Sequence, residues 1–208
     1  MKNDLKQELP TLDEAKSLLK DGQRLSPGPW VDHSINVGKA AMLIAEKCKD
    51  INPDTALVLG MLHDIGYRYG HVDIKHILYG YNFAMEKGYD KLARICLTHS
   101  FNCHDIRASL GNWDCFSREE YDFVDGYIKT EEYDDYDKLI QLCDTLALPS
   151  GFCLIEKRMV DVVLRHGMNE HIIDKWKATF ETKKYFEEKM GKSIYSVLPK
   201  VIENTFVL

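Results

Sequence analysis

The doublet His63-Asp64 places an imidazole beside a carboxylate at the end of an apolar run, residues 56–62. An ionised carboxylate in apolar surroundings loses its hydration at a cost of several kcal/mol. A bound divalent cation offsets that cost directly, and imidazoles and carboxylates together suit iron, manganese, cobalt, nickel and zinc. The doublet therefore predicts two metal ligands, although hydrogen bonding at a helix end is an alternative that this pair alone leaves open.

Four more residues of ligand type accompany the doublet: His33 upstream, His76 and His99 downstream, and Asp144 in a later apolar stretch. His33 belongs to a helically spaced apolar stripe, where a single histidine is more often a hydrogen-bonded core residue than a ligand. Asp144 is the stronger candidate, because helix propensity gives no reason for a carboxylate inside the apolar segment 139–148. A hydrogen bond to a neighbouring helix end is the alternative for Asp144.

This order of residues resembles the HD superfamily of metal-dependent phosphohydrolases, whose signature is a His, a His-Asp doublet and a distant Asp. The resemblance spans about residues 28–148, and residues 63–66 have the form of that family's HDIG motif. Two extra histidines between the doublet and the final Asp are typical of members that hold two metal ions. The resemblance thus implies a binuclear centre with the ligands His33, His63, Asp64, His76, His99 and Asp144.

The family resemblance also implies a mechanism. Two ions about 3.5–4 Å apart acidify a shared water and stabilise charge on the attacking and leaving oxygens of a phosphoryl displacement. Asp64 and His63 are the expected catalytic residues, acting through a hydroxide that bridges the metals, which are iron, manganese or another transition metal. The implied division of ligands gives one ion to His33, His63 and Asp144, the other to His76 and His99, and both to Asp64.

The expected substrate is a small phosphate ester or anhydride, with a nucleotide favoured; phosphomonoesterase, phosphodiesterase and pyrophosphohydrolase activities are not distinguished. A cyclic-di-GMP phosphodiesterase is disfavoured, because Tyr67 follows Gly66 where that branch has a lysine, and the chain contains no Gly-Tyr-Pro. Two alternatives remain. One is a mixed-valent di-iron oxygenase similar to myo-inositol oxygenase, acting on a small organic substrate, and the other is a non-catalytic binding module stabilised by metal.

The histidine that follows the doublet is ambiguous by spacing, because both His71 and His76 come soon after it. The segment that begins at His76 resembles the family pattern, in which a small residue follows the histidine at the next helical turn, so His76 is favoured. Cationic and histidine side chains near the ligands in sequence are candidates for contacts with phosphate oxygens, with solvated helix-face cations as the alternative. The predicted substrate-binding residues are Arg68, Lys75, Arg94, His104 and Arg107.

The composition indicates a globular chain of 208 residues, 45% of them hydrophobic, and one domain over residues 1–208 is the simplest division. A net charge of -6 provides no basic field, so extended nucleic acid is not an expected partner. The six cysteines include no Cys-x-x-Cys pair, and residues 1–8 are polar. We therefore expect a reduced, cytoplasmic protein without a membrane anchor, and the sequence indicates no oligomeric state.

Helical periodicity predicts an all-α bundle in which a motif-bearing core, residues 28–148, is followed by C-terminal helices over 153–208 that pack on it. Capping boxes begin helices at Thr11 and Ser117, and Gly66 is expected to end the central helix as a left-handed cap. The segment 101–116 is the longest expected loop, and its place after His99 favours a role in shaping a pocket. The expected helices cover about residues 11–20, 33–48, 53–66, 73–87, 90–100, 117–129, 136–148, 153–165 and 169–190.

Overall fold

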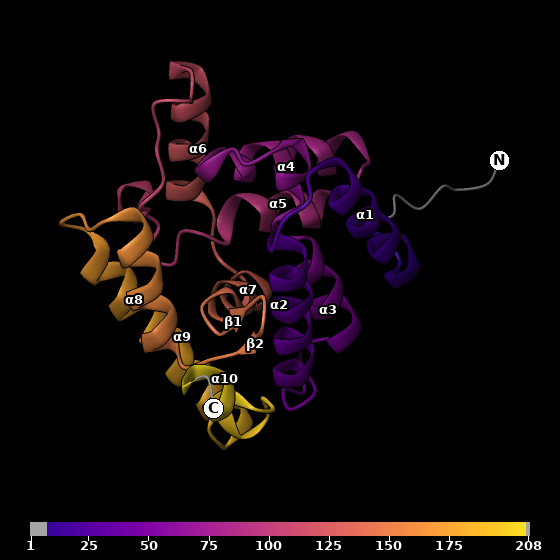
Figure 1. The fold of residues 1–208 in the computed structure, drawn as a ribbon, viewed down its shortest axis with the longest axis vertical. Helices are drawn as coiled ribbons and strands as arrows, with labels where there is room; N and C mark the ends of the chain where they lie inside the picture. The colour runs from indigo at the N-terminus through magenta and orange to yellow at the C-terminus, as the bar shows by residue number, and fades with distance from the viewer. Residues whose placement is uncertain (1–7, 207–208) are drawn as a thin grey trace.

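Helices dominate the computed structural model, which describes residues 8–206, and the all-α prediction is confirmed (Figure 1). The α-helices are α1 (Leu12–Leu25), α2 (Trp30–Ala45), α3 (Pro53–Leu62), α4 (His76–Glu86), α5 (Asp90–Thr98), α6 (Arg118–Thr130), α7 (Asp135–Asp144), α8 (Ile155–His166), α9 (Ile172–Met190) and α10 (Val201–Phe206). Short 3-10 helices are η1 (Ile65–Tyr69), η2 (Asp73–Lys75), η3 (Ile106–Ala108) and η4 (Ile194–Ser196). The sheet of this part of the chain is an antiparallel hairpin of β1 (Ala147–Leu148) and β2 (Gly151–Phe152).

Both predicted capping boxes are confirmed. The Thr11 and Ser117 hydroxyl groups accept hydrogen bonds from the backbone N–H groups three residues later, at Glu14 and Glu120. The two glutamate carboxylates in turn accept hydrogen bonds from the backbone N–H groups of the capping residues, at 2.7 Å in each case. These local contacts satisfy the N–H groups that the first turn of a helix leaves free, so they begin α1 and α6 where the sequence predicts.

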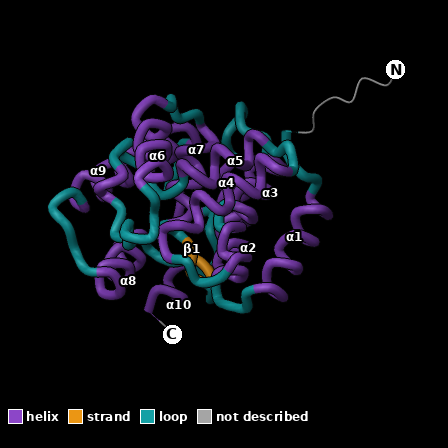
Figure 2. The backbone as a smooth tube through the Cα atoms, turned by 90° about the horizontal axis from the view of Figure 1, so that it is seen from above, coloured by secondary structure: helices purple, strands orange, loops and turns teal. Residues whose placement is uncertain are grey.

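Helices α2, α3 and α7 pack against one another, with α2 lying along α3 (Figures 1 and 2). Their apolar faces form the main hydrophobic core, in which Val37, Leu59 and Leu139 are fully buried. A second core forms where α4 and α5 meet η3 and α6, around Ile77 and Phe101. Because α4 and α5 contribute side chains to both cores, their positions are fixed from two sides.

Two glycines allow α2 and α3 to approach closely. A Cβ atom on Gly60 would lie 2.6 Å from the Cα of Gly38, and a Cβ atom on Gly38 would lie 2.7 Å from the carbonyl oxygen of Leu57. Backbone atoms cannot move aside as a flexible side chain can, so both positions require glycine. This crossing sets the separation between His33, in α2, and His63, which directly follows α3.

The prediction that Gly66 is a left-handed helix cap is wrong. The central helix ends at Leu62, and Gly66 lies inside η1 and outside the set of glycines with positive φ. Its role is to provide space, because a Cβ atom there would lie 1.9 Å from the carbonyl oxygen of His76 and 2.7 Å from the nitrogen of Gly80. Gly66 therefore allows the turn after the doublet to lie against the first turn of α4.

Other predicted helix limits are also wrong: α1 continues past residue 20 to Leu25, α2 begins three residues before His33, and two further differences affect the candidate site. The helix expected over 73–87 begins with the 3-10 turn η2, so that His76 is the first residue of α4. The helix expected over 136–148 ends at Asp144, where the hydroxyl of Thr145 donates a hydrogen bond to the carbonyl oxygen of Leu142 (2.7 Å) before the chain enters β1. Both differences place a predicted metal ligand at the end of a helix.

The C-terminal helices contact the central elements unequally. Helix α9 packs against α7 and η3, and α10 packs against β2. Phe186 of α9 and Val201 of α10 are buried in the main core. In α8 the buried residues are Ile155 and Met159, so its other residues are half-buried or exposed. Within residues 8–206, no helix combines the length and the hydropathy needed to cross a membrane.

Candidate metal centre

Five of the six predicted ligands lie at the end of a helix or just beyond it, and segments far apart in sequence thereby converge. The sixth, His33, lies in the first turns of α2 and faces the same cluster. The five are His63 and Asp64 after α3, His76 at the start of α4, His99 after α5, and Asp144 at the end of α7.

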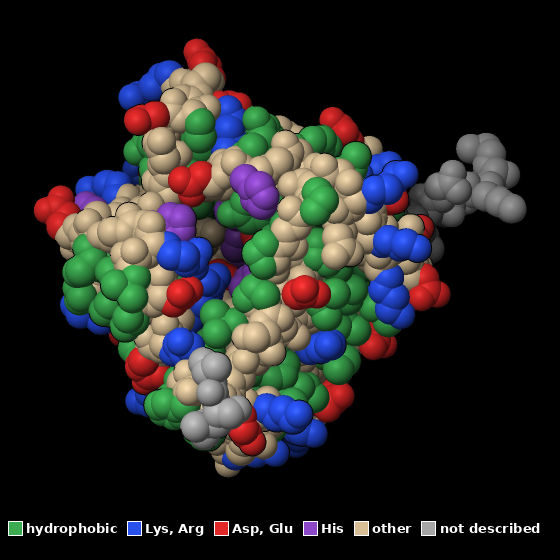
Figure 3. All heavy atoms as spheres, viewed as in Figure 1, with side chains coloured by type: hydrophobic (Ala, Val, Ile, Leu, Met, Phe, Trp, Pro, Cys, Tyr) green, Lys and Arg blue, Asp and Glu red, His purple; other side chains and the backbone are tan. Residues whose placement is uncertain are grey.

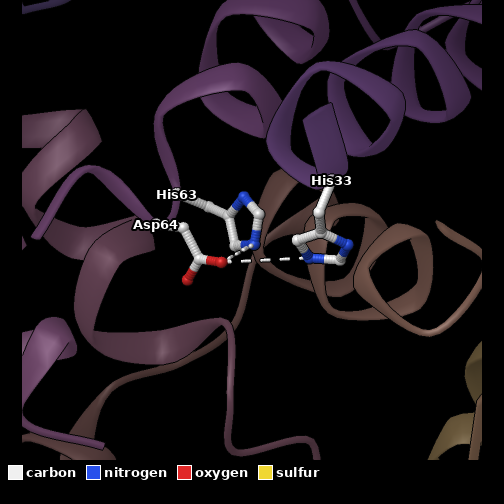
Figure 4. Close-up of side chains that lie close together, drawn as sticks. All are labelled: His33, His63 and Asp64. Carbon is white, nitrogen blue, oxygen red and sulfur yellow. Dashed lines mark ion pairs between the residues drawn. The ribbon is translucent and has the colours of Figure 1, made fainter. Parts of the chain in front are cut away.

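Asp64 lies at the centre of this cluster, and its two carboxylate oxygens face different histidines. Oδ2 lies 3.4 Å from Nε2 of His63 and 3.9 Å from Nε2 of His33 (Figure 4). Oδ1 lies 3.1 Å from Nε2 of His76 and 3.5 Å from Nε2 of His99. The potential ligand atoms thus form two buried groups that share Asp64, one with His33 and His63 and the other with His76 and His99.

Backbone carbonyl groups orient three of the imidazoles, each through the Nδ1 atom. The pairs are His63 with Gly60, His76 with Asp73, and His99 with Ile95. A carbonyl oxygen only accepts, so Nδ1 carries the proton and a neutral ring has its lone pair on Nε2. A lone pair that faces a carboxylate oxygen is repelled by it unless a cation or a proton lies between them. This orientation is the one that metal-ligating histidines adopt.

His33 and Asp144 extend the first of the two groups. Nε2 of His33 lies 3.0 Å from Oδ1 of Asp144, while Nδ1 of His33 is buried without a hydrogen-bond partner among the described residues. A guanidinium nitrogen of Arg158 lies 3.7 Å from the same Asp144 oxygen. Asp144 therefore connects the histidine cluster to a cationic side chain of α8.

The buried polar atoms of the cluster test whether the residues fit a metal. Nε2 of His63 is buried, and no hydrogen-bond partner for it exists in the described part of the chain. An unsatisfied buried acceptor costs about 1–3 kcal/mol. A cation bound between His63, His33 and Asp64 would remove this cost, and imidazole and carboxylate together are suitable ligands for a divalent transition metal. The residues therefore fit a divalent metal ion.

Burial and charge set the pKa values of the cluster. Burial opposes ionisation of Asp64, but the charges of His63 and His76 outweigh it and hold the pKa of Asp64 well below its ordinary value. Burial lowers the pKa of His99 to about 3 and also lowers the pKa of His63. Burial acts in the same direction on His76, yet the charge of Asp64 raises the pKa of His76 above its ordinary value. The pKa directions of Asp64, His63 and His99 favour the charged carboxylate and neutral imidazoles that metal binding requires, whereas His76 would have to release a proton to bind a metal.

Two cavities reach the cluster. The smaller, of about 180 Å³, is bordered by His76 and Asp144, and the larger, of about 550 Å³, is bordered by His33 and Asp64. Tyr67 borders both cavities, and its ring stacks on His76 with 4.2 Å between ring centroids. Figure 3 shows a hollow in the middle of one face of the molecule, with His, Lys and Arg side chains around it. A small molecule in either cavity would contact the cluster.

The five predicted substrate-binding residues lie outside both cavities, and each has another partner. For Arg94 the reason is helix geometry, because it lies five positions before His99, an offset that turns its side chain by about 140° away from that of His99. The partners are Phe83 for Arg68, Glu120 for Lys75, Asp137 for Arg94, Tyr133 for His104 and Asp105 for Arg107.

Cationic side chains of the C-terminal helices border the smaller cavity instead. They include Arg158 of α8 and Lys175 of α9, which are not among the predicted residues because they are distant from the ligand motif in sequence. A signal was present, since each follows a buried isoleucine, Ile155 or Ile172, by three residues. That spacing places both cations on the inner face of their helices.

The structure also separates the two histidines that spacing left ambiguous. Nε2 of His76 lies 3.1 Å from Oδ1 of Asp64. His71 instead borders the larger cavity, where Gly28 leaves room for its ring. His76 is thus the one of the two that lies within the ligand cluster.

Comparison with known proteins gives one match. The family model of the HD domain matches residues 30–148 of the chain, a range that contains all six residues of the cluster. No curated protein and no solved structure matches the chain at a significant level.

Proposed function

Because the chain belongs to the HD-domain family, a superfamily of metal-dependent phosphohydrolases, we propose that it hydrolyses a small phosphate ester or anhydride, with a nucleotide as the favoured substrate. HD domains bind divalent metals, and the two buried groups around Asp64 are where we place them. The ligands in this proposal are His33, His63, Asp64, His76, His99 and Asp144.

The proposal rests mainly on the placement of the two oxygens of the Asp64 carboxylate. Each of its oxygens faces two imidazole nitrogens at 3.1–3.9 Å, so one carboxylate serves both groups. If two cations were bound by these groups, Asp64 would contribute a ligand oxygen to both, as carboxylates do in two-metal phosphoryl-transfer sites. Hydrogen-bonded core histidines would not require all four rings to face a single carboxylate, so we interpret the cluster as a binuclear metal site.

The side chains of the cluster have distinct roles in this proposal. Two divalent cations, when bound, supply Lewis acidity for the phosphoryl group and for the attacking water. Asp64 supplies negative charge to both positions, and His63 and His99 present neutral Nε2 atoms because burial lowers their pKa values. Tyr67, stacked on His76, covers one face of that ring and limits the access of bulk water to it.

The direct test is the variant Asp64→Ala, measured for phosphate release from a panel of mononucleotides, dinucleotides and sugar phosphates. We expect turnover to fall below detection and bound metal to be lost, with the helical content of the circular dichroism spectrum retained. The matched control is Asp54→Ala, which removes an exposed carboxylate from the first turn of α3, ten residues earlier in the chain. Asp54→Ala should leave both turnover and metal content unchanged.

Two results would contradict the proposal. Phosphate release that survives Asp64→Ala would remove the bridging carboxylate from the reaction. An absence of phosphate release from every compound, together with substrate-dependent O₂ uptake by the iron-loaded protein, would instead favour a mixed-valent di-iron oxygenase.

A further inference from the structure

The walls of the smaller cavity have two origins. Tyr67, His76 and Asp144 come from the segment that matches the HD domain, residues 30–148. The facing wall comes from α8 and α9, which follow that segment, and it contributes Arg158 and Lys175. The family match therefore does not account for the chemistry of this second wall.

Lys175 is a cation with no ion-pair partner among residues 8–206. Its ammonium group donates one hydrogen bond, to the carbonyl oxygen of Ser100 at 2.9 Å. Burial lowers the pKa of Lys175, while the charge of Asp144 acts in the opposite direction. Lys175 is half-buried, and an ammonium group withdrawn from water normally has a carboxylate within ion-pair distance, so an anion in the cavity would add the close counter-charge that Lys175 lacks.

Arg158 is only loosely paired. Its guanidinium nitrogens lie 3.5 Å from Asp161 and 3.7 Å from Asp144, whereas strong charge-assisted hydrogen bonds measure about 2.7–2.9 Å. A guanidinium group has five N–H donors in a planar fork that matches the oxygens of phosphate. Arg158 borders both cavities, so its remaining donors are available to an anion that lies beside the candidate metal centre.

The same wall also contains apolar side chains. Met159 of α8, and Ile172 and Trp176 of α9, border the smaller cavity together with the two cations. Trp176 is half-buried, and an indole face of this kind accepts a flat apolar group well. The wall thus combines an anion-binding element with an apolar surface, whereas the net charge of the chain is -6.

We propose that Arg158 and Lys175 form an anion-binding subsite beside the candidate metal centre, and that Met159, Ile172 and Trp176 hold a compact apolar or aromatic body attached to the anion. The identification of this anion as a phosphoryl group rests on the proposed function. The substrate class is then a small phosphate monoester with an apolar or aromatic body, and its recognition depends on α8 and α9.

The test is calorimetric binding of two non-hydrolysable probes, phenylphosphonate and methylphosphonate, to the protein as purified with its metal. Arg158→Gln and Lys175→Met should each weaken both probes about tenfold or more, because each loses a charged hydrogen bond to the anion. Lys175→Arg, which keeps the charge, should retain most of the affinity. Trp176→Leu should weaken phenylphosphonate and leave methylphosphonate unchanged, because only the first probe has a ring.

Lys177→Met is the matched control, since Lys177 lies on the exposed face of α9, paired with Asp174, two residues from Lys175. It should bind both probes as the wild type does. Wild-type protein that binds neither probe at millimolar concentration would overturn the subsite. Wild-type affinity in both Arg158→Gln and Lys175→Met would overturn the subsite as well. The melting temperatures of all variants verify that they are folded.

The phosphate-release screen separates failure of the subsite from failure of the proposed function. If the wild type releases phosphate while Arg158→Gln and Lys175→Met bind the probes with unchanged affinity, the subsite is wrong and the proposed hydrolase function stands. If the variants lose affinity for the probes but the wild type releases phosphate from no compound, the subsite stands and the proposed hydrolase function is wrong.

Discussion

The ligand cluster and helix α8 border the same cavities, but they are held in place to very different degrees. Around Asp64 every histidine is buried, and backbone carbonyl groups orient three of the four rings. In α8 the buried residues are Ile155 and Met159, and Leu164 is 81% exposed. The difference indicates that the part of the site expected to carry the chemistry is fixed by packing, whereas substitutions on the outer face of α8 should have little effect on stability.

The largest effect of this difference is expected at Gly66. Gly66→Ala should lower the free energy of unfolding by about 4 kcal/mol or more, because the new Cβ meets backbone atoms of α4 at 1.9 and 2.7 Å. Gly126→Ala is the control, since Gly126 lies in α6 with no atom within 4 Å of its Cβ position. It should be neutral or stabilise by up to about 1 kcal/mol. Urea denaturation measures both, and a loss below about 1 kcal/mol for Gly66→Ala would contradict the tight packing.

A smaller effect is expected at Arg94, which distinguishes a structural cation from a substrate-binding one. Arg94 pairs with the fully buried carboxylate of Asp137 and with Glu131. Arg94→Gln should lower the free energy of unfolding by about 3 kcal/mol, because it leaves a buried charge without its counter-ion. The KM for substrate should not change. A raised KM with unchanged stability would instead support the sequence-based prediction that Arg94 binds phosphate.

The smallest effect is expected on the outer face of α8. Leu164→Ser should change the free energy of unfolding by no more than about 0.5 kcal/mol, because Leu164 is 81% exposed and leaves no cavity when shortened. The matched variant is Leu62→Ala, which shortens a fully buried side chain next to the doublet. Thermal denaturation compares the stability losses of the two variants. The buried substitution should cost about 2–5 kcal/mol. Equal costs would abolish the contrast between the two regions.

The sequence predicts features that depend on local chemistry. The capping boxes at Thr11 and Ser117 are local contacts over three residues, and both form as predicted. The all-α class follows from helical periodicity. His63 and Asp64 stand out because polar groups at the end of an apolar run need partners, and the structure buries both beside other ligand-type residues.

Features that depend on contacts between distant segments are not predictable in this way. Gly66 looks like a helix cap in sequence, but the atom that requires glycine belongs to His76, ten residues later. Arg94 is close to His99 in sequence and turned away from it in space. Arg158 and Lys175 lie far from the motif, and only the packing of α8 and α9 brings them to the cavity.

The central claim is that Asp64 serves two metal positions, and the metal content of the purified protein tests it most directly. After anaerobic reconstitution with excess Mn²⁺ or Fe²⁺ and removal of unbound ions, elemental analysis should give two ions per chain for the wild type. The double variant His76→Ala, His99→Ala should keep one ion, because His33, His63, Asp64 and Asp144 remain. One ion per chain in the wild type, unchanged in the double variant, would contradict the account.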